Sequence, residues 1–171
     1  GCAGDPSTFT ITVNPIPAAT FINSGPVCEG GTISFTDQST VSTGTINQWS
    51  WTLGGTAGTS TSQNPSSTYA NPGAPVVVLH ITTAEGCSYS ITQVITVNAN
   101  PVADAGDNME ICVGGNTTLT ASGGGNYLWN PGALNTAAIN VSPVSTQVYT
   151  VTVTNSNGCF ASDFATVNVN P

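Results

Sequence analysis

The segment from Gly158 to Pro171 reads GCFASDFATVNVNP, which is a Gly-Cys turn, an alternating strand and an Asn/Pro boundary. The same order of features recurs at Gly86–Pro101 and at Gly1–Pro15. A second segment, Cys28-Glu-Gly-Gly-Thr32, recurs as Cys112-Val-Gly-Gly-Asn-Thr117. Self-similarity of this kind is the sequence signature of a repeat architecture. We call Cys28 and Cys112 the early cysteines, and Cys2, Cys87 and Cys159 the late cysteines.

The two recurring segments divide the chain into modules. We interpret residues 1–17 as the last strand of a preceding repeat, because Cys2 is a late cysteine without an early one before it. We predict two complete repeats, residues 18–100 (the first repeat) and residues 101–171 (the second repeat). Proline at both boundaries limits hinge freedom, so a string of such modules is expected to form a semi-rigid rod.

Within each repeat, short strands are separated by turn residues every 8–12 positions, which is the spacing of a β-sandwich. No segment keeps a helical period of 3.6 residues. The sequence therefore predicts an all-β fold of tandem Ig-like sandwiches. The expected strands are 32–35, 48–53, 76–82 and 90–97 in the first repeat, and 117–121, 127–129, 138–141, 147–154 and 164–169 in the second.

Alternation within these strands predicts which side chains form the cores, because successive residues point to opposite faces. We expect Trp49 and Trp51 to anchor the first core, and Trp129 and Tyr149 the second. Aliphatic side chains at alternate positions complete the predicted inward faces: Val77, Leu79 and Ile81, and Val151 and Val153.

The composition excludes several classes of function. The chain has no lysine or arginine, eight acidic residues and one histidine. It therefore offers no cationic surface for nucleic acid and no lysine or arginine to bind a phosphate group. His80 is the only histidine available as a base for a nucleophile, and alternation places it on an outer strand face. No apolar run approaches the length of a membrane helix. We expect no catalysis, no nucleic-acid partner and no membrane insertion.

The five cysteines suggest an oxidising, extracellular setting. We predict that each complete repeat closes its own disulfide, Cys28 with Cys87 and Cys112 with Cys159, and that Cys2 pairs upstream. Each such bond contributes about 4 kcal/mol on the chain-entropy estimate. The alternative is a set of free thiols or a metal site, although the spacing lacks the CxxC pattern of zinc sites.

A run of acidic residues opens the second repeat. Asp104 and Asp107 supply hard oxygen ligands of the kind that calcium prefers, and calcium at a module junction would stiffen a rod. The alternative interpretation is a solvated turn, which most Asp/Gly segments form. No other cofactor is expected. Asp37 is interpreted as structural, since it can accept hydrogen bonds from nearby backbone amides.

An ordered set of motifs gives the first repeat its family resemblance. They are Ile33-Ser-Phe35-Thr-Asp37-Gln-Ser39, Trp49-Ser-Trp51-Thr-Leu53-Gly54-Gly55, Asn64-Pro65…Tyr69…Pro72-Gly73 and Val77-Val-Leu79. In this order they resemble the PKD domain, a β-sandwich named after polycystic kidney disease. The family's usual Gly-Asp-Gly is Gly54-Gly55-Thr56 here, so a role for that aspartate is not carried over.

The second repeat resembles the shorter Ig-like modules that accompany PKD domains. Tandem arrays of this style resemble large surface proteins of gliding Bacteroidota that the type IX secretion system exports. The resemblance implies a structural segment of an adhesin stalk or filament at the bacterial cell surface. Its partners would be neighbouring repeats, and other copies in a filament. The alternatives are an accessory PKD module of a secreted polysaccharide-degrading enzyme or peptidase, and a glycan-binding module.

Overall fold

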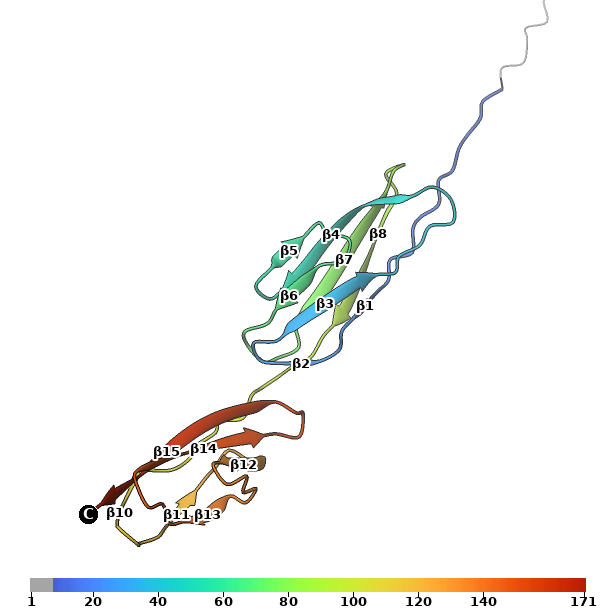
Figure 1. Ribbon diagram of the computed structural model, residues 1–171. Helices are drawn as coiled ribbons and strands as arrows, with labels where there is room; N and C mark the ends of the chain where they lie inside the picture. Colours follow the sequence, from blue (N-terminus) through green and yellow to red (C-terminus); the bar gives the residue numbers. More distant parts are fainter. Residues whose placement is uncertain (1–7) are drawn as a thin grey trace, which may run out of the picture. The chain divides into compact units, whose positions relative to one another are not determined.

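The computed structural model describes residues 8–171, and this part of the chain contains strands and no helix (Figure 1). The predicted all-β fold class is confirmed. The chain divides into two compact units. Unit 1 comprises the described residues up to Gly25 together with Thr32–Thr68 and Pro75–Ile95. Unit 2 comprises Pro26–Gly31, Tyr69–Ala74 and Thr96–Pro171.

Unit 1 contains a four-stranded and a three-stranded antiparallel sheet, coloured blue to green in Figure 1. The larger sheet has the order β5-β4-β7-β8 and the smaller has the order β1-β3-β6. The bounds of the larger sheet's strands are Gly58–Ser60 (β5), Ile46–Gly54 (β4), Val76–Thr83 (β7) and Ser88–Val94 (β8). Those of the smaller sheet are Phe21–Asn23 (β1), Thr32–Asp37 (β3) and Ser66–Thr68 (β6).

The core of unit 1 is built around Trp51. This side chain is fully buried and makes edge-on or tilted contacts with Phe21 and Phe35, at ring-centroid distances of 5.0 and 5.8 Å. Such arrangements are favoured by the quadrupoles of aromatic rings. The Trp51 Nε1–H donates to the carbonyl of Ser62 at 3.0 Å, so the buried indole has a polar partner. The predicted inward face of β7 is confirmed: its three alternating aliphatic residues, Val77, Leu79 and Ile81, are 0% exposed.

Unit 2 contains one larger sheet and two short strand pairs. The four-stranded sheet has the order β10-β15-β14-β12, and β11 pairs with β13 antiparallel. A further pair, β2 with β9, is parallel. The bounds are Met109–Cys112 (β10), Phe160–Asn170 (β15), Gln147–Thr154 (β14), Asn126–Asn130 (β12), Thr117–Thr120 (β11), Ala138–Val141 (β13), Val27–Cys28 (β2) and Val97–Asn98 (β9).

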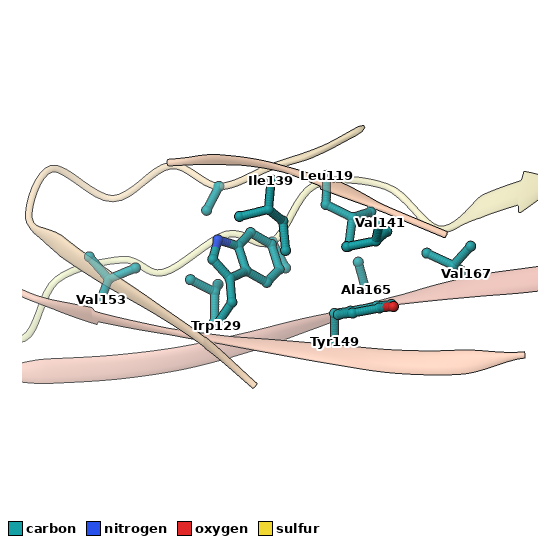
Figure 2. Close-up of a cluster of buried hydrophobic side chains, with 11 residues drawn as sticks. Leu119, Trp129, Ile139, Val141, Tyr149, Val153, Ala165 and Val167 are labelled. Carbon is teal, nitrogen blue, oxygen red and sulfur yellow. The ribbon is translucent and has the colours of Figure 1, made fainter. Parts of the chain in front are cut away.

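The core of unit 2 packs around the indole of Trp129, which lies among aliphatic side chains from the two facing sheets (Figure 2). Trp129 is fully buried and Tyr149 is 8% exposed. The Trp129 Nε1–H donates to the carbonyl of Thr136 at 3.1 Å. The predicted inward face of β14 is also confirmed, because Val151 and Val153 are completely buried.

Both hairpins that the alternating strands imply are present. β7 and β8 are joined through Glu85-Gly86, and β14 and β15 are joined through Asn157-Gly158. The two glycines have φ angles of +87° and +80°, which a tight turn requires and which other residues rarely adopt.

The predicted repeats and the two compact units do not share all their boundaries. Three short segments of the first repeat, Pro26–Gly31, Tyr69–Ala74 and residues 96–100, belong to unit 2. The boundaries at 17/18 and 100/101 stay predictions. Within the described residues, no helix is long and apolar enough to cross a membrane.

Candidate functional site

One disulfide is present in the described part of the chain, and it lies within unit 2. Cys28 is bonded to Cys159, with an S–S distance of 1.99 Å and a Cα–Cα distance of 5.5 Å. Cys28 ends β2, opposite Asn98 of β9, and Cys159 directly precedes β15. Cys159 is fully buried. Among the described cysteines, Cys87 and Cys112 are free thiols.

This bond corrects the predicted pairing of Cys28 with Cys87 and of Cys112 with Cys159. The reason is clearest in β15, because Cys112 lies opposite Asn170 at its C-terminal end, whereas Cys159 precedes its first residue. The 11 residues of β15 separate the two positions, or about 36 Å. A disulfide needs Cα atoms about 4–7 Å apart. The early and late cysteines of the second repeat therefore lie at opposite ends of β15. Cys2, predicted to pair upstream, lies outside the described residues.

A groove of about 470 Å³ lies on unit 1, over β4, β7 and the loop after β5. Its lining is polar apart from one indole. The lining residues are Asn47, Gln48, Trp49, Ser50, Thr61, Gln63, His80 and Thr82. Trp49 is only partly buried, so it differs from Trp51 and Trp129 and is not a core residue.

Asp37, at the end of β3, holds one edge of this groove together. Its Oδ2 accepts hydrogen bonds from Trp49 Nε1 at 2.7 Å and from Gln63 Nε2 at 3.2 Å. Its Oδ1 accepts the amide of Ser39 at 3.0 Å. Burial alone would raise the pKa of Asp37, but the hydrogen bonds from Ser39, Trp49 and Gln63 outweigh it and hold the pKa below its usual value.

His80 has no carboxylate partner in the described part of unit 1. Its exposed ring makes hydrogen bonds to two hydroxyl groups, Ser90 Oγ at 2.8 Å and Thr82 Oγ1 at 3.5 Å. A Ser–His pair on an open strand face lacks the third, orienting group of a catalytic triad. This geometry gives no reason to assign catalysis to His80.

The two predicted calcium ligands are both exposed. Asp104 Oδ1 accepts the amide of Gly106 at 2.8 Å, which is the geometry of a local turn. No group of three or more His, Cys, Asp or Glu side chains that could hold a metal ion occurs in residues 8–171. The arrangement matches the solvated-turn interpretation of this segment.

The layered, mainly antiparallel sheets define the chain as one built of Ig-like β-sandwiches. Residues 14–97 match the family model of the PKD domain, so the chain contains a member of the PKD domain family. The matched family is a non-catalytic sandwich domain. A PKD domain together with a disulfide is typical of extracellular proteins. No curated protein matches the chain significantly.

Several solved structures are similar to this chain. The PKD1 domain of Vibrio anguillarum Epp is 25% identical, with 51% of this chain and 99% of that one covered and a TM-score of 0.45. The PKD1 domain of the Vibrio cholerae metalloprotease PrtV is 30% identical, with 48% and 98% covered and a TM-score of 0.43. A structure of carbohydrate-binding modules from the β-sandwich superfamily is 26% identical, with 84% and 56% covered and a TM-score of 0.47.

Sequence reasoning missed the groove and its Asp37–Trp49 contact. Alternation places Trp49 on the same face of the strand as Trp51. It does not show whether the facing sheet extends far enough to cover Trp49. The acidic residue of the Phe35-Thr-Asp37 motif was a signal that could have been used. A carboxylate next to a core strand needs hydrogen-bond donors, and the indole N–H of a tryptophan is such a donor.

Proposed function

We propose that this chain is a structural repeat segment of a long extracellular adhesin stalk or surface filament. The chain resembles the tandem arrays of large surface proteins that gliding Bacteroidota export by type IX secretion. The observation that carries the proposal is the disulfide between Cys28 and Cys159, which joins residues on either side of the predicted repeat boundary at 100/101. A bond that crosses from one repeat to the next is expected where tension along the chain must be resisted.

The surface composition supports the same role. The chain has no lysine or arginine, so trypsin-like proteases find no cleavage site in it. Only eight side chains carry a charge at neutral pH, so most of the surface available for lateral contact in a filament is uncharged. Neighbouring repeats of the same chain are the first partners expected.

Immunogold electron microscopy of the organism that makes this chain would test the proposal. Antibodies raised against residues 8–171 should label surface fibres at regular intervals, and pre-adsorption with the purified chain should remove the label. Labelling confined to a soluble secreted protein would overturn the stalk proposal. It would favour the alternative, an accessory PKD module of a secreted polysaccharide-degrading enzyme or peptidase.

A second candidate function is glycan binding in the groove of unit 1. Trp49 is partly exposed, and the amide groups of Asn47, Gln48 and Gln63 line the same groove. Ligand sites commonly combine an aromatic surface with a few polar groups that fix orientation. This candidate rests on the exposure of Trp49.

A glycan array followed by titration calorimetry would test the groove. Trp49→Ala should abolish any binding detected with the unmodified chain. Tyr89→Ala is the matched control, because Tyr89 is 53% exposed and is not a lining residue. Melting curves of both variants would show that the fold is retained. An array without hits, or equal loss in both variants, would count against this function.

A further inference from the structure

The free thiol of Cys112 occupies the same structural position as the bonded Cys28. Each ends a short strand that pairs in parallel with the last strand of its repeat, Cys28 opposite Asn98 and Cys112 opposite Asn170. The turn that follows is also the same. The amide of Gly31 donates to the Cys28 carbonyl at 2.8 Å, and the amide of Gly115 donates to the Cys112 carbonyl at 2.9 Å.

The free thiol of Cys87 likewise occupies the position of the bonded Cys159. Each lies in the hairpin before a long strand and closes it through its carbonyl, which accepts the amide of Thr83 or Asn155 at 2.8 or 2.9 Å. The cysteine amide is held as well, by Thr83 Oγ1 at 3.2 Å and by Asn155 Oδ1 at 3.1 Å. The backbone around each free cysteine is therefore hydrogen-bonded in the same way as the backbone around its bonded counterpart.

A second observation shows where the partner of Cys87 would lie. In the recurring segment, Asn14 stands at the position of Asn98 and Asn170, and those two residues each lie opposite an early cysteine. The Sγ of Cys87 lies 3.8 Å from the backbone oxygen of Asn14. An early cysteine of a preceding repeat, paired with Asn14 in the same register, would therefore lie beside Cys87.

We infer that Cys87 and Cys112 form the same bond as Cys28 and Cys159, with the neighbouring repeats on either side. Cys112 would bond to the late cysteine of the following repeat, and Cys87 to the early cysteine of the preceding one. The inference rests on the proposed function, because it needs repeats of this kind in succession. Each early cysteine is then linked to the next repeat's late cysteine, and the covalent loops overlap along the array.

The bond forms by thiol–disulfide exchange with a small disulfide oxidant such as glutathione disulfide. The Cys112 thiolate attacks one sulfur of the oxidant, displaces a glutathione thiolate and forms a mixed disulfide. The neighbouring late cysteine, as its thiolate, then attacks the Cys112 sulfur and displaces the second glutathione thiolate. Two thiols lose two electrons and two protons, and one glutathione disulfide becomes two glutathione thiols.

A tandem chain would test the inference with the full sequence. Residues 1–171 carrying Cys2→Ser are followed directly by residues 16–171, because Asn170-Pro171 then stands where Asn14-Pro15 stood. The tandem is refolded at low concentration with glutathione disulfide, denatured, alkylated and mapped by mass spectrometry. We expect a peptide pair linking Cys112 of the first copy to Cys87 of the second, and about two alkylated thiols where the unlinked tandem would have about four.

Cys112→Ser in the first copy is the matched control, and it should leave Cys87 of the second copy alkylated while both Cys28–Cys159 bonds persist. Free thiols at both positions in the unmodified tandem would overturn the inference. So would bonds within one repeat, or covalent dimers of the tandem in place of the internal bond. None of these results depends on whether native fibres exist, so failure of this inference and failure of the stalk proposal are distinguishable.

Discussion

Cys28 and Cys159 are bonded across a sequence separation of 131 residues, with Cα atoms 5.5 Å apart. The bond encloses most of the chain in one covalent loop, including all of the family match after β2 and most of the second repeat. A force applied to the two ends therefore passes through the bond. Strands inside the loop can lose their packing, but the chain between Cys28 and Cys159 cannot be drawn out while the bond is intact.

Single-molecule force spectroscopy should detect this restriction directly. Pulled from its ends, the oxidised chain should extend only over the residues outside the loop, or about 14 nm at about 3.5 Å per residue. Reduction should release about 46 nm more, because the enclosed residues then contribute to the contour length. Cys28→Ser should behave like the reduced chain with or without reductant, and Cys112→Ser like the oxidised one. Equal contour lengths with and without reductant would contradict the assignment of this bond.

Equilibrium stability should depend on the same bond. Cys28→Ser is expected to lower the free energy of unfolding by up to about 5 kcal/mol, since the chain-entropy cost of an open loop grows with its length. Cys112→Ser removes an exposed free thiol and should change stability by less than about 0.5 kcal/mol. Urea unfolding of both variants, each compared with the unmodified chain, measures the difference. A similar loss in both would show that the thiol-to-hydroxyl change, and not the bond, is responsible.

The second glycine after each early cysteine has a definite steric role. A Cβ added at Gly31 would lie 2.8 Å from the Cys28 carbonyl oxygen, and one added at Gly115 would lie 2.9 Å from that of Cys112. Neither oxygen can move without breaking its turn. Gly31→Ala is expected to destabilise the turn by more than about 1 kcal/mol and to slow formation of the Cys28–Cys159 bond on re-oxidation. Glu29→Ala, at the same turn, is the control, and re-oxidation rates that match in the two variants would refute this account.

The all-β fold class could be predicted from the sequence because strand alternation and turn residues are local signals. Each predicted strand overlaps an observed one, and the alternation in β7 and β14 identifies the buried face correctly. The strands that escaped prediction are short or lack clear alternation, as in β2 and β5. Their pairing depends on partners distant in sequence, which a local pattern does not contain.

The disulfide pairing needed information that spacing does not provide. The recurrence of early and late cysteines suggested one bond per repeat, and counting them could not distinguish a bond within a repeat from one to the next. The deciding fact is the parallel register of Cys112 with Asn170, which places the two cysteines of one repeat at opposite ends of β15. The partial exposure of Trp49 was missed for a related reason. Its exposure depends on how far the facing sheet of the sandwich extends, and the local sequence does not contain that information.

The three tryptophans should respond differently to substitution. Trp51→Ala and Trp129→Ala each remove a fully buried indole and should cost about 3–5 kcal/mol in their own units. Trp49→Phe keeps most of the apolar contact and loses the hydrogen bond to Asp37, so a cost of about 1 kcal/mol is expected. Thermal unfolding followed by circular dichroism measures the three changes. A cost for Trp49→Phe as large as that for Trp51→Ala would place Trp49 in the core after all.

The carboxylate of Asp37 should make the stability of unit 1 depend on acid pH. Its pKa in the folded chain lies below the ordinary value for an aspartate, because the hydrogen bonds from Ser39, Trp49 and Gln63 outweigh the effect of burial. A depressed pKa contributes stability that is fully present above the unfolded-state pKa of about 3.9 and is lost as pH falls through the folded-state value. Asp37→Asn should therefore melt below the unmodified chain at pH 7, and the gap between their melting temperatures should narrow as pH falls below about 4. The other acidic side chains titrate in both proteins, so they cancel in the comparison. A gap that stays constant from neutral to acid pH would show that the Asp37 carboxylate contributes nothing to folding through its charge.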